Sequence, residues 1–198
     1  MCENETVWLQ QAILGDDQAF ALLVERYKNP VYSLCYRMLG NSKDAEDAAQ
    51  ESFMRAYLHL KKYDPNRPFA TWFLSIASHY CIDRIRKKQL PTISVDAIPD
   101  EMIVDRTAPN PEKKFREAER ELLVQTLIAE LKPLDRAAII LRYWHGYTEV
   151  EIAETLNLSV SAVKSRLFRS RQALAESWLA SADNTLPSKR RPDESPAF

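Results

Sequence analysis

The sequence contains very little glycine. Among its 198 residues only Gly15, Gly40 and Gly146 are glycines. Phosphate-binding loops and dinucleotide-binding folds need clustered glycines so that the backbone can approach a phosphate. Few glycines also argue against an all-β fold, which needs many tight turns. The composition therefore favours helices and speaks against the large class of nucleotide-binding enzymes.

Long hydrophobic runs are missing as well. The longest unbroken apolar run, residues 19–24, has six members, whereas a membrane-spanning helix needs about 20. No signal peptide is recognisable at the start of the sequence. We therefore expect a cytoplasmic protein without membrane insertion.

The sequence offers no recognisable catalytic or metal-binding set. Cys2, Cys35 and Cys81 are far apart and form no CxxC pair, so neither a zinc site nor a disulfide framework is expected. The histidines show no ligand spacing. Because no nucleophile–base pair is credible either, we expect no enzymatic activity, no cofactor and no metal.

Neither sign of charge dominates, since 27 basic side chains stand against 28 acidic ones. The charges are unevenly placed, however. Residues 91–111 carry one basic and four acidic side chains, whereas residues 155–175 carry four basic side chains and no acidic one. Local clustering of this kind, rather than net charge, makes a phosphate-binding face.

Prolines divide the chain. Four of them fall within residues 91–111, and prolines prevent a helix from continuing. We interpret this stretch as an acidic linker between two helical domains, residues 1–90 and residues 112–180. Residues 181–198 hold three more prolines among mixed charges and are predicted to be a flexible tail. The expected fold class is all-α with two small domains.

In the first domain, apolar residues recur at helical spacing. Pro30 is expected to open a helix, because proline is tolerated in a first helical turn. Gly40 should end that helix, and Asn41 or Ser42 should cap the next one. The next helix has an inward stripe of mostly small or apolar residues: Ala45, Ala48, Ala49, Phe53, Ala56, Tyr57 and Leu60.

The second domain has the layout of a helix-turn-helix. A helix is predicted over Lys114–Leu131, and Pro133 should open a second one. Thr148 and Glu151 form a capping box, which marks the start of a short helix. Ser159 can then cap a longer basic helix, so that a short helix, a tight turn and a basic helix follow one another.

The last of these helices presents a polar, basic face. Side chains suited to reading DNA in the major groove lie on this face and its flanks: Lys164, Ser165, Arg166, Phe168, Arg169 and Arg171. Basic groups donate to guanine edges or phosphates, and an apolar group can contact a thymine methyl. Phe168 is the most informative, because an aromatic ring gains nothing from facing water. The alternative is a solvated basic helix that closes a bundle.

A second candidate surface lies on the segment Asp44–Tyr57. Its outer face mixes acidic, polar and apolar side chains: Asp47, Gln50, Glu51, Met54 and Leu58. This mixture suits a protein partner with a basic helical surface. A plain solvated surface is the open alternative. A metal site built from Asp44, Asp47 and Glu51 is not expected, since no histidine joins them.

A third candidate surface begins in the loop 61–68 and continues along a helix to about Lys88. One side of that helix would carry a stripe of aromatic and polar residues: Trp72, Ser75, His79, Asp83 and Arg86. The loop and the helix start add Tyr63, Arg67 and Phe69. Bases of a single strand can stack on rings while cations hold its backbone. The alternative is that the aromatic residues are core, as we expect for Phe73.

Three motifs occur in one order along the chain. They are DAEDAAQESFMRAY from Asp44, FATWFLSIASHYCIDRIRK from Phe69 and YTEVEIAETLNLSVSAVKSRLFRSRQAL from Tyr147. With a proline-rich linker between the second and the third, they resemble the bacterial RNA polymerase sigma factors. Because the motifs account for the two domains and no others, the chain resembles the small extracytoplasmic-function (ECF) branch over residues 12–178.

This resemblance implies binding to core RNA polymerase and to promoter DNA. The helix of Asp44–Tyr57 would dock on a basic coiled coil of the polymerase through Asp47, Gln50 and Glu51, with Met54 beside them. The aromatic-basic segment would bind the unpaired minus-ten strand, and the second domain would read the minus-thirty-five element as duplex. The acidic linker would pass near the RNA exit path. An anti-sigma factor is a further implied partner.

The chain departs from the family pattern at three places. His79 stands where the family often has asparagine, which bears on the preferred minus-ten base. Ser161 and Ala162 replace the usual Gly-Thr at the start of the recognition helix. The tail after Trp178 is longer than the minimal family needs.

The residues alone leave two other functions open. A stand-alone helix-turn-helix transcription regulator would bind duplex DNA unaided and would not need the aromatic-basic segment. A helical adaptor that binds only proteins would not need Phe168 and its basic neighbours.

Overall fold

The computed structural model describes residues 3–89 and 111–185, and within those ranges helices are the only regular secondary structure. The first half comprises α1 (Glu3–Ile13), α2 (Asp17–Leu39), α3 (Ser42–His59), a 3-10 turn η1 (Leu60–Lys62) and α4 (Phe69–Gln89). The second half comprises α5 (Pro111–Glu130), α6 (Pro133–Tyr143), α7 (Glu149–Leu156) and α8 (Val160–Thr185). The all-α class predicted from the sequence is confirmed.

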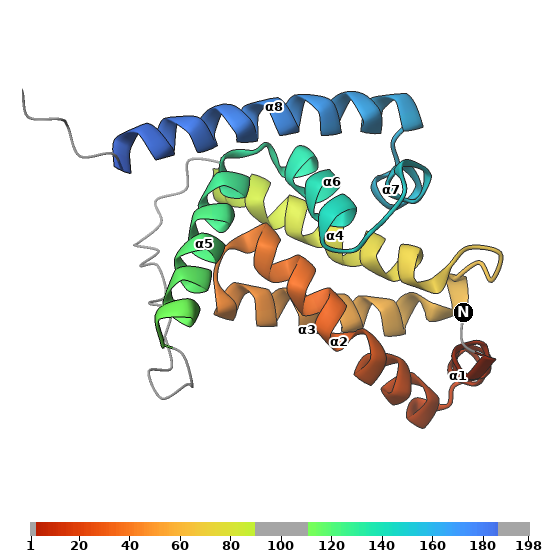
Figure 1. The fold of residues 1–198 in the computed structure, drawn as a ribbon. Helices are drawn as coiled ribbons and strands as arrows, with labels where there is room; N and C mark the ends of the chain where they lie inside the picture. Colours follow the sequence, from red (N-terminus) through yellow and green to blue (C-terminus); the bar gives the residue numbers. More distant parts are fainter. Residues whose placement is uncertain (1–2, 90–110, 186–198) are drawn as a thin grey trace, which may run out of the picture.

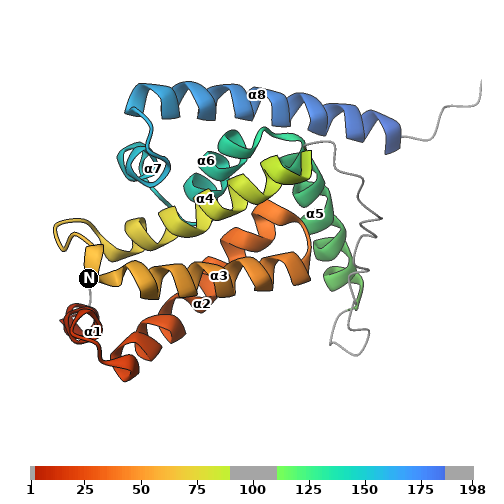
Figure 2. The same ribbon diagram turned by 180° about the vertical axis from the view of Figure 1, so that it is seen from behind.

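The helices of each half pack against one another, and the two halves also touch. In Figure 1, α2, α3 and α4 form one bundle, and α1 lies across the N-terminal end of α2. α5, α6 and α7 lie against this bundle, and α8 runs along the outside of the molecule. The opposite view in Figure 2 shows the same order. The chain therefore brings both predicted domains into one body.

α2 runs without interruption through Pro30, so the expectation that Pro30 opens a helix is wrong. Proline removes one backbone hydrogen bond and crowds the preceding turn, which usually breaks a helix. Here Tyr27, Val31 and Leu34, on either side of the proline, are all buried against neighbouring helices. That packing stabilises the helix on both sides of Pro30, where one backbone hydrogen bond is missing. Local sequence rules do not include this contribution, because it comes from neighbouring helices.

The predicted boundary between α2 and α3 is confirmed. Gly40 adopts the left-handed backbone conformation, with φ of 83°, and ends α2. Asn41 then caps α3, because its side-chain oxygen accepts a hydrogen bond of 2.7 Å from the backbone N–H of Asp44. Gly40 is the natural residue here, since a left-handed φ strains residues that carry a Cβ.

The helix starts predicted for the second half are also confirmed. Pro133 is the first residue of α6. At α7 the capping box is complete: Glu151 N–H donates to Thr148 Oγ1 at 3.3 Å, and Thr148 N–H donates to Glu151 Oε2 at 2.8 Å. Ser159 Oγ accepts from a backbone N–H in the first turn of α8 at 3.2 Å. α8 extends to Thr185, so residues 181–185, which were predicted to begin the flexible tail, belong to this helix.

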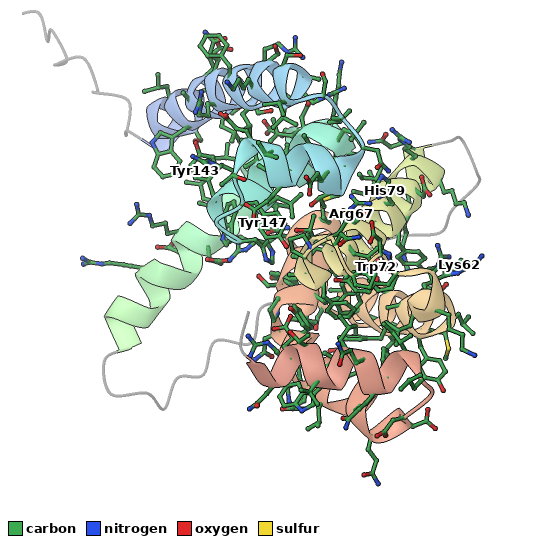
Figure 3. The ribbon with its side chains drawn as sticks, turned by 90° about the vertical axis from the view of Figure 1, so that its right-hand side faces the viewer. Lys62, Arg67, Trp72, His79, Tyr143 and Tyr147 are labelled. Carbon is green, nitrogen blue, oxygen red and sulfur yellow. The ribbon has the colours of Figure 1, made fainter. Side chains whose placement is uncertain are left out.

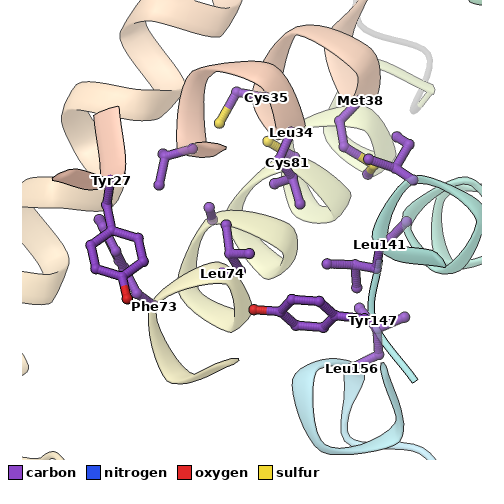
Figure 4. Close-up of a cluster of buried hydrophobic side chains, with 14 of the residues drawn as sticks. Tyr27, Leu34, Cys35, Met38, Phe73, Leu74, Cys81, Leu141, Tyr147 and Leu156 are labelled. Atoms are coloured by element: carbon purple, nitrogen blue, oxygen red, sulfur yellow. The ribbon is translucent and has the colours of Figure 1, made fainter. Parts of the chain in front are cut away.

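The two halves share one hydrophobic core, which the sequence does not predict. Figure 4 shows Leu74 of α4 and Met38 of α2 beside Leu141, Tyr147 and Leu156 of the second half. Because these side chains are buried against one another, the two halves are not separate domains in this structure but share one core.

This packing leaves one face of α4 uncovered. The helix packs on α2 and α3 and also on α6 and α7. Its buried residues are Phe69, Thr71, Phe73, Leu74, Ala77, Ser78, Cys81, Ile82 and Ile85. Successive residues turn by about 100° around a helix, so these positions cover more than half of its circumference. The remaining face carries the predicted stripe: Trp72, Ser75 and His79 are half-buried, while Asp83 and Arg86 are exposed.

Candidate nucleic-acid and polymerase interfaces

The outer face of α8 carries a compact polar surface around one exposed ring. Lys164, Ser165, Phe168 and Arg169 line a shallow hollow of about 410 Å³. Phe168 is 55% exposed although it belongs to a helix whose opposite face, including Val163, is buried. An aromatic ring beside two cations and a hydroxyl, at the second helix of a helix-turn-helix, is placed to contact the edges and backbone of duplex DNA.

Three of the basic residues assigned to this face from the sequence have other contacts. Lys164 Nζ lies 3.9 Å from Glu149 Oε2 of α7, a loose contact between partly exposed side chains. Arg166 Nη1 lies 2.7 Å from Asp135 Oδ1, and both side chains are largely shielded from solvent. Arg166 therefore ties α8 to the start of α6 instead of extending freely from the recognition face. Arg171 is exposed, but it lines an apolar hollow beside Trp144 and Trp178. The surface available to DNA is thus smaller and more apolar than the sequence predicts.

The rings of the aromatic-basic segment form a layered cluster. Tyr63 and Phe69 are only 7% and 2% exposed, so neither offers a free face to a base, contrary to the expectation for them. Trp72 lies over them with ring centroids 5.2 Å from Tyr63 and 5.6 Å from Phe69. Tyr63 Oη in turn donates to the carbonyl of Arg67. The two buried rings thus support Trp72, which is half-buried and borders the uncovered face of α4.

The loop before α4 brings cations to the same end of the molecule. Figure 3 shows Lys62 and Arg67 on the side where Trp72 lies, with His79 further along α4. Lys62 is exposed and Arg67 is half-buried. Cations beside an aromatic ring are the combination that binds a nucleic-acid single strand.

His79 and Arg86 continue this face along α4. His79 Nδ1 lies 2.8 Å from the carbonyl oxygen of Ser75, so Nδ1 donates and, in the neutral ring, Nε2 is left as an acceptor. Arg86 is exposed and is 3.9 Å from Asp83 Oδ1, a loose contact that leaves its guanidinium available.

The outer face of α3 is exposed as the sequence predicts. Asp47, Gln50 and Met54 are exposed, and Glu51 is half-buried. Glu51 Oε1 accepts from Arg55 at 2.7 Å on the same helix. Such an exposed pair contributes little to stability, so Glu51 can exchange this partner for another cation at low cost. The outer face of α3 therefore presents the acidic side chains of Asp47 and Glu51 beside the apolar side chain of Met54.

Asp44, at the start of α3, belongs to an internal network. Burial by itself would raise the pKa of Asp44, but hydrogen bonds from Asn41 and Lys88 and the charge of Arg84 lower it to about 2. Lys88 Nζ is 2.6 Å from Asp44 Oδ2. The carboxylate is thus committed to joining α3 to α4. Within residues 3–89 and 111–185, no group of histidine, cysteine, aspartate and glutamate side chains could hold a metal ion.

Sequence reasoning did not single out the residues that join the two halves. Arg37, Gln125, Arg136 and Tyr147 contact helices of the opposite half. Their partners lie as much as 98 positions away along the chain, so no local pattern reveals them. The one signal available was Arg136 itself, a charged residue among the buried apolar positions of α6.

Comparison with known proteins finds a matching family for each half of the chain. The Sigma-70 region 2 family matches residues 23–90, and the Sigma-70 region 4 family matches residues 121–174. The ECF RNA polymerase sigma factor SigW of Bacillus subtilis (strain 168) is 40% identical over 175 residues, which cover 84% of this chain and 92% of SigW. The chain belongs to the ECF sigma factors. It therefore acts in transcription initiation, without enzymatic activity of its own, by binding core RNA polymerase and promoter DNA.

Further relatives agree with this membership. The ECF RNA polymerase sigma-E factor of Escherichia coli (strain K12) is 34% identical over 179 residues, covering 86% of this sigma factor and 92% of that protein. The solved structure of CnrH in complex with the cytosolic domain of CnrY superposes with a TM-score of 0.65 at 28% identity, covering 91% of this chain and 99% of CnrH. The stand-alone regulator and the adaptor are thereby disfavoured.

Membrane insertion has no support in the helices of this sigma factor. In the two described ranges, none of them combines the length and the apolar character that crossing a bilayer requires.

Proposed function

We propose that this sigma factor divides promoter recognition between its two halves. Residues 1–90 would dock on the polymerase and bind the minus-ten element as a single strand, and residues 112–180 would read the minus-thirty-five element as duplex. Residues 91–111 would link the two, and residues 181–198 would be a tail. The matches to Sigma-70 regions 2 and 4 support this division.

The duplex-reading surface consists of Lys164, Ser165, Phe168 and Arg169. The single observation that carries this assignment is the exposure of Phe168 between two cations on the outer face of α8. Leaving a phenyl ring in water costs free energy, and contact with a thymine methyl would recover it. Arg171 lies at the edge of the surface, and Arg166 holds the recognition helix in place through Asp135.

The single-strand surface consists of Arg67, Trp72, His79 and Arg86. An unpaired base would stack on Trp72, and the cations would hold the strand backbone. Tyr63 and Phe69 act from beneath by fixing the orientation of Trp72. His79, with Nε2 as an acceptor, would receive a hydrogen bond from an exocyclic amino group of a base.

The docking surface consists of Asp47, Gln50, Glu51 and Met54 on α3. Acidic groups around an apolar side chain complement a basic helical surface on core polymerase. Strand opening would then follow from differential binding. Because Trp72 and its neighbours contact bases only after the strands separate, their binding energy favours the open promoter over the closed one.

A cytoplasmic location and an anti-sigma partner complete the proposal. Core polymerase and promoter DNA are the partners of this family, and both are inside the bacterial cell. Among the solved structures with the same fold is a sigma factor RpoE in complex with the anti-sigma factor NepR from Bartonella quintana. A partner of that kind would cover the DNA-binding or docking surfaces of this chain.

Run-off transcription from genomic fragments with purified core polymerase tests the proposal. The wild-type chain should direct transcripts whose start sites share two upstream elements. Phe168→Ala should reduce transcription from promoters that depend on the upstream element, whereas Leu179→Ala, which removes an exposed apolar side chain from the far end of α8, should not. Equal transcription by all three chains would contradict the assignment of Phe168, and no transcription by the wild type would contradict the proposed function.

A further inference from the structure

The start of α7 lies beside the proposed duplex-reading surface of α8. The two helices pack against one another, and Figure 1 shows the short helix α7 next to the first turns of α8. Asn157 turns the chain between them, with a left-handed φ of 53°. In a helix-turn-helix the second helix enters the major groove while the first crosses the DNA backbone. α7 would therefore lie near phosphates when α8 reads bases.

Glu149, the first residue of α7, brings a carboxylate to this surface. Its Oε2 lies 3.9 Å from Nζ of Lys164, which lines the hollow around Phe168. Residues 155–175 carry four basic side chains and no acidic one. The carboxylate beside Lys164 thus comes from the other helix of the motif, and the sequence of the basic helix does not reveal it.

Glu149 has a different role from the neighbouring acid, Glu151. The carboxylate of Glu151 accepts from the backbone N–H and the hydroxyl of Thr148, both at 2.8 Å, and completes the capping box. Glu149 is not part of that box, but it adds a second negative charge to the first turn of α7. An uncharged helix start attracts phosphate. The start of α7 is therefore poorly suited to hold the DNA backbone.

The contact between Glu149 and Lys164 is too exposed to serve mainly for stability. The two side chains are 39% and 62% exposed, and exposed ion pairs contribute little to the free energy of unfolding. Arg166 and Asp135, on the same motif and α6, form a contrasting pair that is 2.7 Å apart and only 27% and 18% exposed. Lys164 can therefore exchange or share its partner at low cost, whereas Arg166 is held in place.

Lys164 has two kinds of partner on duplex DNA. Its flexible stem can carry the ammonium to a phosphate on any sequence, or to O6 and N7 of a guanine. A phosphate would bring its negative charge close to the carboxylate of Glu149, and like charges repel. A guanine edge is uncharged and carries no such cost. Because an ammonium has three donors, Lys164 can bond guanine while it stays near Glu149.

We propose that Glu149 is a specificity-determining residue of this sigma factor, which directs Lys164 to a guanine edge and opposes its binding to phosphate. All duplex DNA offers phosphates, whereas only a matching element offers the guanine. Glu149 therefore weakens binding to unrelated DNA more than binding to the minus-thirty-five element. It is a positioning residue, since it acts through Lys164. This inference rests on the proposed duplex-reading surface.

The substitution Glu149→Gln tests the proposal, because it removes the charge and keeps the shape of the side chain. Glu154→Gln makes the same change at an exposed position about 140° further around α7 and is the matched control. Fluorescence anisotropy of the full chain measures binding to two labelled duplexes over a series of salt concentrations. One duplex carries the upstream element found by run-off transcription, and in the other that element is scrambled.

Glu149→Gln should bind the scrambled duplex several-fold more tightly than the wild type at low salt. The matching duplex should gain less, so the preference between the two should fall. The slope of log K against log salt for the scrambled duplex should steepen by about 0.9, the value of one additional phosphate contact. Glu154→Gln should match the wild type. If Glu149→Gln keeps the wild-type preference and salt slope, the proposal is overturned.

Lys164→Met shows whether Glu149 acts through the lysine. In a chain that already carries Lys164→Met, the addition of Glu149→Gln should leave the salt slope for the scrambled duplex unchanged, because no ammonium remains to be redirected. The same steepening with and without Lys164 would overturn the proposal, since Glu149 would then act by its charge alone.

The comparison also separates this inference from the proposed function. If the wild-type chain does not distinguish the two duplexes, the duplex-reading surface itself fails. The salt slopes for the scrambled duplex still decide whether Glu149 keeps Lys164 from phosphate.

Discussion

Arg166 and Arg169 show how neighbouring residues of one type acquire different roles. Both are basic, both lie on α8, and both carry the charge that made the helix a candidate DNA reader. Arg166 meets Asp135 at 2.7 Å and is largely shielded, whereas Arg169 stays exposed beside Phe168. The difference arises from the position of α6, which places a carboxylate on one side of the helix only.

Substitution of the two arginines should therefore affect two different properties, DNA affinity for one and stability for the other. Arg169→Ala should weaken binding to a minus-thirty-five duplex by about 1–3 kcal/mol if it contacts a base, with little change in the free energy of unfolding. Arg166→Ala should lower the free energy of unfolding by about 1 kcal/mol, because it leaves Asp135 without its partner. Fluorescence anisotropy and urea unfolding measure the two quantities. Full duplex affinity in Arg169→Ala would remove this residue from the DNA surface.

At the scale of the element, α4 has to satisfy three neighbours at once. One side packs on α2 and α3, a second on α6 and α7, and the remaining face is covered by no helix. Because α4 packs on two sides, its apolar residues are spread around much of the helix instead of forming one narrow stripe. The stripe predicted from spacing survives because it occupies the face that no helix covers.

Trp72→Ala should separate promoter binding from promoter opening. Removal of the indole leaves the duplex contacts of α8 intact but takes away the ring on which an unpaired base would stack, worth about 1–3 kcal/mol. Closed-complex formation should be near normal, while permanganate reactivity of thymines around the minus-ten element should fall. Normal reactivity in a folded Trp72→Ala chain would return this residue to the core.

The exposed face of α3 should be required for holoenzyme formation. Glu51→Lys reverses the charge at the centre of the proposed docking surface and should abolish co-purification with core polymerase. The fold should be retained, since the pair with Arg55 is exposed. Glu46→Lys, at another exposed position of α3, is the control. If Glu51→Lys binds core polymerase as well as the control does, the docking surface lies elsewhere.

At the scale of the whole molecule, a titratable histidine, His145, lies near the interface between the two halves. His145 is largely buried near Arg37, and its Nε2 makes no hydrogen bond in the structure. Burial and the charge of Arg37 lower the pKa of His145 to about 4. His145 therefore takes up a proton less readily in the folded structure than in an unfolded chain, where its pKa returns to about 6.5.

Acid should consequently weaken the folded protein. Above about pH 6.5, the usual histidine pKa, His145 is neutral in both the folded and unfolded chains and adds no pH dependence. As the pH falls from 6.5 toward 4, only the unfolded chain takes up the proton, so the free energy of unfolding falls, by about 1 kcal/mol at pH 5.5. Urea unfolding at pH 7.5 and 5.5 measures this loss, and His145→Gln should reduce it. An equal loss in both chains would assign the pH dependence to other groups.

Much of this protein follows from local sequence signals. Helix ends at Gly40, Asn41, Pro133 and Thr148 are determined by residues at most four positions apart, and each is found where the sequence places it. The exposed faces of α3, α4 and α8 follow from helical spacing in the same way. Capping and periodicity act within one or two turns, so the sequence alone is sufficient to reveal them.

Tertiary structure decides the rest, because the deciding contacts join distant residues. Pro30 is held inside a helix by packing, Tyr63 and Phe69 are drawn into the core, and Arg166 meets a carboxylate 31 positions away. The contact between the two halves includes hydrogen bonds that span 88 to 98 positions, such as those of Gln125 and Arg136 with the end of α2. Whether a polar side chain on a helix faces water or another helix depends on where that other helix lies, and no local pattern carries this information.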